Sequence, residues 1–383
     1  MASIQALVQQ YGYSISNLTV PTIDGCDLTL FSVTDPRVDG DRPPVFLQHG
    51  FLDSATTWVI NPPQQSLGLM LASAGFEVFL GNSRGNRYSS GIKAHPPSSR
   101  EYWQWSFQEM AQFDLPAFIG AIKARTGSAT VPVVGHSQGT TQTFAALATN
   151  ISLADGTPLS DSVPLFVALA PAASAAHMSS PIFKLGFALD AGALLALVGS
   201  YNLMPDNRTA AAFARKLCSV PSSWEGPCED AFDLLFGYNA SNLNASRLGL
   251  YASHVPSGTS VFDLEHFSQL WSYARRSGQQ AFRMYDHGAP GNLRAYGQRT
   301  PPDYNLSHVR NKVAIYSGSL DRLADPSDVK WLVSQLPTSP LLWRRLDGYS
   351  HIDFVWGQTA ARDIYPEIIA LLQAHAVGRA PQS

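Results

Sequence analysis

The feature that most constrains the fold of this chain is a Gly-x-Ser-x-Gly motif. It follows a short apolar run and leads directly into a helical pattern. Residues 131–134 are the apolar run, residues 135–139 are Gly-His-Ser-Gln-Gly, and a helical pattern follows over residues 140–149. This context is typical of the nucleophile elbow, a sharp strand-to-helix turn that exposes a serine hydroxyl. We therefore predict that Ser137 is a nucleophile, placed where the free N–H groups of a helix N-terminus stabilise developing negative charge.

Beyond this motif, the chain alternates short apolar segments with helical patterns. That alternation predicts an α/β fold with a mostly parallel central sheet and helices on both faces. A hairpin is predicted first, around Asp24-Gly25. The predicted strands after it are residues 45–47, 76–80, 131–134, 164–169, 312–316 and 341–346, and the predicted helices are residues 66–74, 102–125, 140–149, 329–336 and 361–374.

The alternation stops between residues 172 and 310, where Ala, Leu, Ser, Asn and Phe form helical patches. We therefore predict a core that consists of residues 1–171 and 311–383. Residues 172–310 are predicted to be a mainly helical insertion that folds over the sheet.

An activated serine needs a base and an acid, which in a fold with this elbow follow in the order Ser, Asp or Glu, His, each after a later strand. Asp321 comes just after a predicted strand, and His351 lies thirty positions further on, behind the next one. Asp325 competes with Asp321, but it precedes a proline at the start of a helical pattern and is better explained as an N-cap. Asp353 is too close to His351 to reach Nδ1 while Nε2 faces the serine. We predict a triad of Ser137, Asp321 and His351.

The oxyanion that forms during attack by such a serine needs two backbone N–H donors. Gln138, directly after the nucleophile, supplies one. The apolar strand at residues 45–47 leads into His49-Gly50, and Gly50 lets the chain bend so that the N–H of Phe51 points into the site. Phe51 and Gln138 are therefore the predicted oxyanion hole.

Charge and composition exclude several other functions. A net charge of −3 with no run of like charge provides no surface suited to nucleic acid. The most apolar stretch, residues 185–204, is interrupted by Asp190 and three glycines, so no transmembrane segment is predicted. Because there is no His-Glu-x-x-His motif and no Cys/His cluster, we expect neither a metal nor a cofactor. Nothing indicates an oligomeric state.

The signals for a cellular compartment are uneven. The first residues lack the basic and continuous apolar regions of a signal peptide, so none is expected within this chain. Six Asn-x-Ser/Thr sequons favour a secretory route. The glycosylation candidates are Asn17, Asn150, Asn207, Asn239, Asn244 and Asn305.

Several longer segments make the chain resemble the acid lipases, meaning the gastric and lysosomal lipases and their plant triacylglycerol-lipase relatives. The most specific are LQHGFLDSATTW at 47–58, GHSQGT at 135–140, SLDRLADPSDV at 319–329 and GYSHIDFVWG at 348–357. The resemblance implies an α/β-hydrolase that cleaves lipid esters, triacylglycerols above all, without a cofactor. It also matches Ser137, Asp321 and His351 to the family triad, and Phe51 and Gln138 to its oxyanion positions.

By the same resemblance, the insertion is a cap and lid, and Cys218 and Cys228 form a disulfide. Cys26 is then a free thiol, and a secreted, lysosomal or vacuolar protein is expected; an intracellular, lipid-associated protein is the alternative. One departure is Asp53, where relatives have a small or hydrophobic residue. A carboxylate beside the oxyanion loop would oppose an anionic intermediate, so acyl preference and pH optimum stay open.

A site for lipid esters must offer apolar surface, and a movable cover keeps that surface from water. We therefore expect a segment near residues 207–236 to shield Ser137 and the enzyme to act at a lipid interface. The apolar side chains expected to face inward are Phe183, Leu185, Phe187, Leu194 and Leu197. The alternatives are an esterase for short-chain or steryl esters and a non-catalytic ligand-binding protein.

Overall fold

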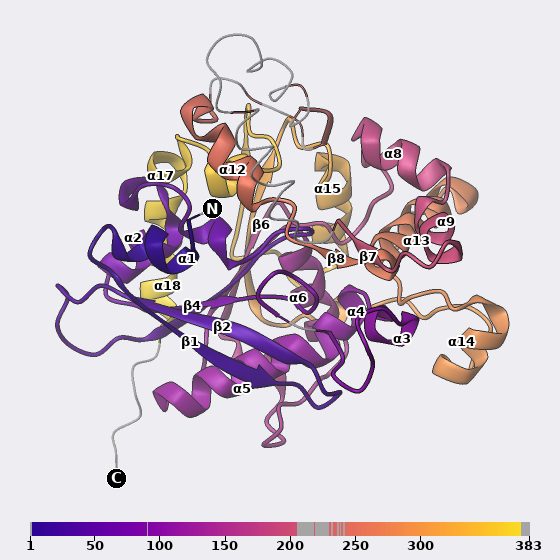
Figure 1. Cartoon of the computed structure of the whole chain (residues 1–383), viewed down its shortest axis with the longest axis horizontal. Helices are drawn as coiled ribbons and strands as arrows, with labels where there is room; N and C mark the ends of the chain where they lie inside the picture. Colours follow the sequence, from indigo (N-terminus) through magenta and orange to yellow (C-terminus); the bar gives the residue numbers. More distant parts are fainter. Residues whose placement is uncertain are drawn as a thin grey trace.

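The computed structural model describes residues 2–89, 91–204 and 242–376, together with residues 218, 230, 233–235, 237 and 239. Its centre is an eight-stranded sheet in the order β1-β2-β4-β3-β5-β6-β9-β10 (Figure 1). The two edge pairings β1–β2 and β2–β4 are antiparallel, and all pairings from β4 to β10 are parallel. The strands are β1 Ser14–Pro21, β2 Asp27–Thr34, β3 Pro44–Gln48, β4 Glu77–Gly81, β5 Val133–His136, β6 Leu165–Leu169, β9 Lys312–Gly318 and β10 Leu342–Leu346. The predicted hairpin and the predicted mostly parallel sheet are confirmed.

Burial explains why the central strands have continuous apolar sequences. All residues of β3 and β6 are buried, because parallel strands in the middle of the sheet are covered on both faces. The edge strand β1 is different: most of its residues are exposed or half-buried, and only Val20 is fully buried.

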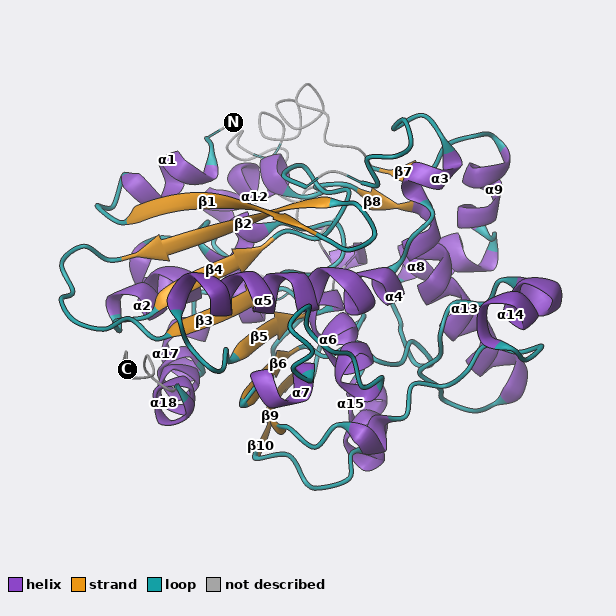
Figure 2. Cartoon of the chain, turned by 90° about the horizontal axis from the view of Figure 1, so that it is seen from below, coloured by secondary structure: helices purple, strands orange, loops and turns teal. Residues whose placement is uncertain are grey.

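Helices cover both faces of the sheet, as predicted. α5 and α6 pack against each other on one face, and α2 and α18 lie on the other (Figures 1 and 2). The helices of the core are α1 Ile4–Gln9, α2 Leu67–Ser73, α5 Leu115–Thr126, α6 Gln138–Ala148, α7 Leu159–Ser162, α15 Pro326–Gln335, α16 Asp353–Trp356, α17 Ala360–Asp363 and α18 Tyr365–His375.

The prediction of one continuous helix over residues 102–125 is wrong. The segment is divided into α3 Arg100–Trp103, α4 Phe107–Glu109, a π-helical turn Met110–Asp114 and α5. A new helix begins at Ser106 because of a capping box: the Ser106 hydroxyl accepts from the backbone N–H of Gln108, and the Glu109 carboxylate accepts from the N–H of Ser106.

The insertion between β6 and β9 contributes a group of helices beside the sheet. α8 Pro181–Ala188, α9 Ala191–Leu197 and α13 Val261–Ser277 pack on one another at one side of the molecule (Figure 1). α12 Leu248–His254 packs elsewhere, where Tyr251 stacks on Trp356 of the core with ring centroids 4.6 Å apart. The remaining elements are α14 Gly288–Tyr296 and a two-stranded ribbon of β7 Asn202–Leu203 and β8 Thr259–Ser260. Most of the predicted shielding segment, residues 207–236, lies outside the described residues.

Within the described ranges, no helix is long and apolar enough to cross a membrane.

Candidate active site

The turn from β5 into α6 holds Ser137 in a backbone conformation that side chains rarely adopt. Its φ is +53° and its ψ is −122°, and a non-glycine residue with positive φ stores strain that is typical of functional sites. The turn also brings segments into close contact. A Cβ on Gly139 would lie 2.3 Å from the carbonyl oxygen of Gln48, and a Cβ on Gly50 would lie 2.9 Å from the Cβ of Ser137. Glycine at both positions lets β3 approach the turn this closely.

The structure brings together the three side chains that the sequence singled out. Ser137 Oγ lies 2.7 Å from His351 Nε2, and His351 Nδ1 lies 2.9 Å from Asp321 Oδ2 and 3.0 Å from Asp321 Oδ1. All three side chains are buried. They follow β5, β9 and β10, whose carboxyl ends meet at one edge of the parallel sheet. A carboxylate accepts hydrogen bonds, so the His351 ring donates through Nδ1 and leaves Nε2 free to accept the proton of Ser137.

The two competing aspartates have other partners. Asp325 accepts the backbone N–H of Ser327 at 2.7 Å and caps α15, which confirms the interpretation of Asp325 as an N-cap. Asp353 accepts the N–H of Ser350 at 2.6 Å. Asp321 is itself fixed by two backbone donors, the N–H groups of Leu323 and Ala324, at 2.9 and 2.8 Å.

A second buried histidine holds the backbone of the base in place. His136 Nε2 donates to the carbonyl oxygen of His351 at 2.9 Å. Burial lowers the pKa of His136 to about 3, with a further contribution from the neighbouring His351. His136 therefore stays neutral at pH values well above 3 and adds no positive charge beside His351. Sequence reasoning missed this residue, although it occupies the second position of the motif.

The oxyanion loop is shaped by His49. The backbone N–H of Ser83 donates to His49 Nε2 at 3.0 Å, so the ring proton is on Nδ1, which donates to the carbonyl oxygen of Gly50 at 2.8 Å. Burial lowers the pKa of His49 to about 4, which keeps this arrangement neutral. The N–H groups of Phe51 and Gln138 donate to no other described residue. Both are therefore free for an incoming oxygen, as an oxyanion hole requires.

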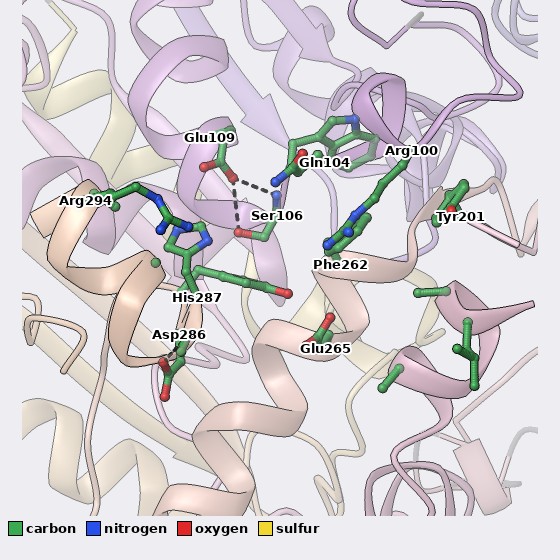
Figure 3. Close-up of a pocket in the computed structure, with 18 residues that line it drawn as sticks. Arg100, Gln104, Ser106, Glu109, Tyr201, Phe262, Glu265, Asp286, His287 and Arg294 are labelled. Carbon is green, nitrogen blue, oxygen red and sulfur yellow. Dashed lines mark hydrogen bonds between the residues drawn. The ribbon is translucent and has the colours of Figure 1, made fainter. Parts of the chain in front are cut away.

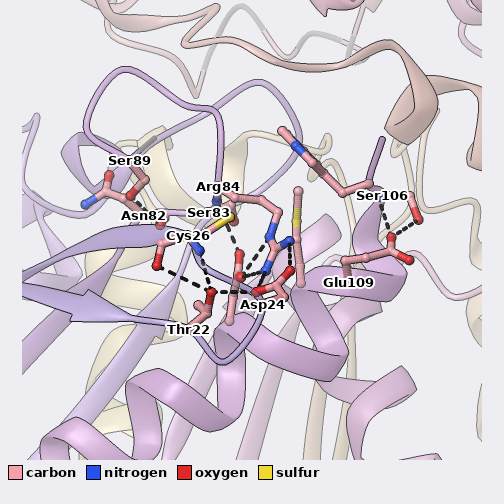
Figure 4. A network of polar contacts seen from close by, with 12 residues as sticks. Thr22, Asp24, Cys26, Asn82, Ser83, Arg84, Ser89, Ser106 and Glu109 are labelled. Carbon is pink, nitrogen blue, oxygen red and sulfur yellow. Dashed lines mark hydrogen bonds and ion pairs between the residues drawn. The ribbon is translucent and has the colours of Figure 1, made fainter. Parts of the chain in front are cut away.

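A buried ion network supports the loop that contains Ser83 (Figure 4). The Arg84 side chain has no solvent exposure and binds Asp114 at 2.6 Å and Asp24 at 2.7 Å. Because an unpaired buried charge costs several kcal/mol, removing either carboxylate is expected to loosen this loop and, through His49, the oxyanion loop.

The pocket that contains Ser137 is small and almost entirely apolar. Its volume is about 60 Å³, well below the several hundred Å³ typical of ligand sites. Phe183 and Phe187, four residues apart on one face of α8, contribute two aromatic rings to its lining. The lining residues are Phe51, Ser137, Ala172, Ser174, Ala175, Met178, Phe183, Phe187, Leu264, Phe267 and Leu323. The pocket is therefore covered in this structure.

The prediction that five insertion side chains face Ser137 is correct only for Phe183 and Phe187. Leu185, Leu194 and Leu197 are 62%, 55% and 83% exposed. For Leu185 the reason is helix geometry. Residues four apart on α8 share a face, whereas Leu185 is two positions from each phenylalanine and therefore points the other way.

Asp53 lies next to the oxyanion loop and is buried. Burial raises the pKa of Asp53 to about 7, while a hydrogen bond from the N–H of Ser54 opposes this shift. At acid pH the side chain is therefore uncharged and does not repel an anionic intermediate.

One further contact to the oxyanion residue comes from a distant part of the chain. Asp263 on α13 accepts from Gln138 Nε2 at 2.6 Å, from the Thr259 hydroxyl at 2.9 Å and from the backbone N–H of Phe107 at 2.9 Å. Burial raises the pKa of Asp263 to about 7, and these hydrogen bonds lower it in part. No sequence signal identified this residue, because 125 positions separate it from Gln138.

A larger depression of about 970 Å³ lies between α3, α9, α13 and α14, away from Ser137 (Figure 3). Its charged lining residues have both signs: Arg100, Arg294, Glu109, Glu265 and Asp286. The triad residues are absent from its lining, so it is separate from the candidate active site.

The other predicted residues lie apart from this site. Cys26 is a buried free thiol, as predicted, and burial raises its pKa to about 12. Cys218 is disulfide-bonded, but Cys228 lies outside the described residues, so the pairing of these two cysteines stays a prediction. Among the described residues, no group of three His, Cys, Asp or Glu side chains could hold a metal ion.

The sequons differ in accessibility. Asn17, Asn150 and Asn305 are exposed, Asn244 is half-buried, and Asn207 lies outside the described residues. Asn239 is half-buried, and its side-chain nitrogen, the atom a glycan would modify, donates to the carbonyl oxygen of Gly348 at 2.7 Å. The side-chain nitrogen of Asn305 is also bonded, to His308 Nε2 at 2.9 Å, but Asn305 is exposed. Asn239, which is both half-buried and bonded, is therefore the least suited of the described candidates.

Comparison with known proteins relates this chain to hydrolases. The family model described as the alpha/beta hydrolase fold matches residues 43–358, and the model described as a partial alpha/beta-hydrolase lipase region matches residues 4–62. The gastric triacylglycerol lipase of Rattus norvegicus is 36% identical over 97% of this chain and 91% of its own length. Lipase member J of Homo sapiens is 36% identical over 97% of this chain and 99% of its own length. Among solved structures, a 2-hydroxy-6-oxo-6-phenylhexa-2,4-dienoate hydrolase from Rhodococcus shares the fold, with a TM-score of 0.53 at 13% identity over 95% of this chain and 99% of its own.

Proposed function

The chain belongs to the acid lipase family of α/β-hydrolases and is a carboxylic ester hydrolase of the lipase type, and we propose that it cleaves acylglycerols through an acyl-enzyme on Ser137. The observation that carries the proposal is the hydrogen-bonded series Ser137–His351–Asp321 at the floor of an apolar pocket. A hydrocarbon chain gains about 0.8 kcal/mol for each buried CH₂, so an apolar pocket suits the acyl part of a lipid ester.

The proposed reaction uses two similar steps. Ser137 Oγ attacks the ester carbonyl carbon as its proton moves to His351 Nε2, and the carbonyl oxygen becomes an oxyanion held by the N–H groups of Phe51 and Gln138. His351 then gives the proton to the departing alcohol, which leaves an acyl group on Ser137. Water repeats the attack with His351 as base, the acyl–oxygen bond to Ser137 breaks, and the fatty acid is released.

We also propose that the enzyme works at a lipid surface. The support is an apolar surface on α8, α9 and the residues that follow them, adjacent to the helix face that covers Ser137. Its exposed members are Ile182, Leu185, Leu189, Leu194, Leu197, Val198 and Met204. Because α8 and α9 pack on each other, these residues lie on neighbouring elements, and exposed apolar surface of this kind is typical of a site that contacts a membrane or a lipid droplet.

The test of the catalytic assignment is a pair of serine variants. Ser137→Ala is expected to fold normally but to lose kcat by about 10⁴ to 10⁶-fold, and a fluorophosphonate probe should no longer label the protein. Ser160→Ala, an exposed serine on α7, is the matched control and should be labelled like the wild type. Labelling of both variants would reject Ser137 as the nucleophile.

The substrate class is tested separately, with a panel of esters that differ in acyl length and in alcohol. Triacylglycerols with long chains should be preferred once an interface is present. A preference for short soluble esters or for steryl esters would instead assign the enzyme to those substrates. Because the serine variants are compared by labelling with a probe that is independent of the ester substrate, a wrong substrate class does not affect the conclusion on Ser137.

We further propose that the protein follows the secretory route. The support is the disulfide at Cys218, since structural disulfides persist in oxidising compartments, and the exposure of three sequons. Asn17, Asn150 and Asn305 are the proposed glycosylation sites. Mass spectrometry of the protein purified from secretory cells should find glycans at these positions.

A further inference from the structure

Asp263 is a buried carboxyl group that links the helices beside the sheet to the oxyanion hole. It lies on α13, in the insertion, and has no solvent exposure. Its Oδ2 accepts from the side chain of Gln138, the first residue of α6, and from the Thr259 hydroxyl next to α13. Its Oδ1 accepts from the backbone N–H of Phe107 at the start of α4. One carboxyl group therefore connects three separate segments.

We propose that Asp263 is a positioning residue for the oxyanion hole. Asp263 holds Gln138 in place by binding the Gln138 side chain, and it slows hydrolysis when its own carboxyl group ionises. This inference rests on the proposed function, because it concerns the oxyanion that forms during ester cleavage.

The positioning part follows from the geometry of Gln138. Its backbone N–H is the proposed oxyanion donor, and its side chain is buried and bonded to Asp263 at 2.6 Å. Fixing the side chain restricts rotation of the residue at the N-terminus of α6. An oxyanion donor contributes most when it is already aligned, since no reorganisation is then needed during the reaction.

The charge part follows from proximity. An ionised Asp263 would place a negative charge one glutamine side chain away from the developing oxyanion, in a site closed to water. Like charges repel strongly where solvent does not screen them, and a slowing of about tenfold is expected. The neutral form is also accommodated, because the Thr259 hydroxyl can either donate to Oδ2 or accept a proton from it.

The groups around Asp263 favour its neutral form below about pH 7. Burial raises the pKa of Asp263, the hydrogen bonds from Gln138, Thr259 and Phe107 lower it in part, and Glu109 on α4 raises it, to about 7 in total. His266, on the same helix, is bonded to the Ser106 hydroxyl and to the carbonyl oxygen of Arg283; burial lowers its pKa to about 3, so it contributes no positive charge. Gln138 and Thr259 present only an amide and a hydroxyl.

The test compares pH profiles of kcat for a soluble short-chain ester, with product quantified after each reaction is stopped. Wild type should lose activity above about pH 7. Because Asp53, beside the oxyanion loop, also has a pKa raised to about 7, the variants are compared in an Asp53→Asn background. In that background Asp263→Asn should abolish the alkaline loss, because the side chain cannot ionise. Glu265→Gln is the matched control: it lies on the same helix but lines the larger depression (Figure 3), and its profile should keep the alkaline loss. An alkaline loss that persists in Asp263→Asn, or that disappears in both variants, overturns the assignment.

One more variant, Asp263→Ala, separates positioning from charge. Asp263→Ala removes the anchor of Gln138 and should lower kcat about tenfold at pH 5 with little change in KM, whereas Asp263→Asn retains an acceptor and should lose less. An equal loss of kcat in Asp263→Ala and Asp263→Asn, or a change in KM without a change in kcat, counts against a positioning role.

If Asp263→Asn fails to fold, Thr259→Val carries the test. It removes one donor to the carboxylate, so the alkaline loss should move to higher pH; an unchanged or lower limit would overturn the charge argument. If the wild-type protein hydrolyses none of the esters, the proposed function is contradicted. If it hydrolyses them but the variants leave the pH profile of kcat unchanged, only the role of Asp263 is contradicted.

Discussion

Replacement of Asp321 by Asn changes one atom of the site, and the consequence follows from the hydrogen bonds around that atom. Asp321 Oδ1 accepts from the N–H groups of Leu323 and Ala324 and lies 3.0 Å from His351 Nδ1, whereas Oδ2 lies 2.9 Å from Nδ1 and has no other donor among the described residues. The asparagine oxygen should therefore take the Oδ1 position, which leaves its NH₂ group facing Nδ1. Two donors cannot share that contact, so Nδ1 gives up its proton and the imidazole carries it on Nε2. Nε2 then points a proton at Ser137 Oγ, 2.7 Å away, and cannot act as base.

The expected loss in kcat is on the order of 10⁴-fold, about 5 kcal/mol of activation free energy, which is the scale of a wrong histidine tautomer in a serine triad. KM should change little, because the lost interaction acts in the transition state. The assay measures kcat and KM on a soluble short-chain ester together with the thermal unfolding midpoint. A loss of less than tenfold in a folded Asp321→Asn variant would refute the role of Asp321.

Asp325→Asn is the control for this substitution, with the same change of charge four positions away. Asp325 caps α15 through the N–H of Ser327, and Asn caps helices as well as Asp does. Activity should therefore stay within about twofold of wild type and stability within a few tenths of a kcal/mol. The reverse ranking of the two variants would identify Asp325 as the acid.

Three further predictions concern stability, cysteines and the interface. The unfolding free energy of Asp53→Asn relative to that of wild type should rise by about 2–3 kcal/mol between pH 5 and pH 8. The reason is that burial raises the pKa of Asp53 to about 7, so the wild-type folded state loses stability as the pH rises and this carboxyl ionises. Chemical denaturation of both proteins at both pH values measures this difference, and the same difference at pH 5 and at pH 8 would contradict the prediction. Thiol titration of the denatured, unreduced protein should count a single free sulfhydryl, Cys26, and a count of three would reject the pairing of Cys218 with Cys228. Activity on a long-chain ester should rise steeply above its solubility limit, while a smooth curve through that limit would argue against a movable cover.

The parts of the site that could be predicted from sequence are those fixed by local order along the chain. Ser137, Asp321 and His351 each follow a strand of the parallel sheet, and parallel strands bring their carboxyl ends to one edge whatever lies between them. The N-cap at Asp325 is likewise local, since a capping side chain, a proline and the helix occupy consecutive positions.

The parts that could not be predicted depend on contacts between distant segments. Asp263 reaches Gln138 only because the fold brings α13 close to the first residue of α6, and nothing near Asp263 in the sequence signals this. The break at Ser106 is different: Ser106 and Glu109, three positions apart, form a capping box, a local signal that the interpretation of the sequence missed. The exposure of Leu185 depends on the rotation of α8 about its axis, which composition alone does not determine.

The two faces of α8 connect the closed pocket to the proposed work at an interface. On the inner face, Phe183 lies 6.1 Å from the ring of Phe51 and Phe187 lies 5.9 Å from that of Trp271, so the helix closes the site with aromatic contacts. On the outer face, Leu185 is 62% exposed, and Leu189, directly after the helix, is 59% exposed. In water, displacing α8 would expose the inner face while the outer face gains nothing, so the closed form is favoured. At a lipid surface the outer face can be buried as well, and an acyl chain can replace the contacts that the inner face gives up. We therefore expect α8, a helix that is apolar on both faces, to favour the closed pocket in water and an open pocket at a lipid surface.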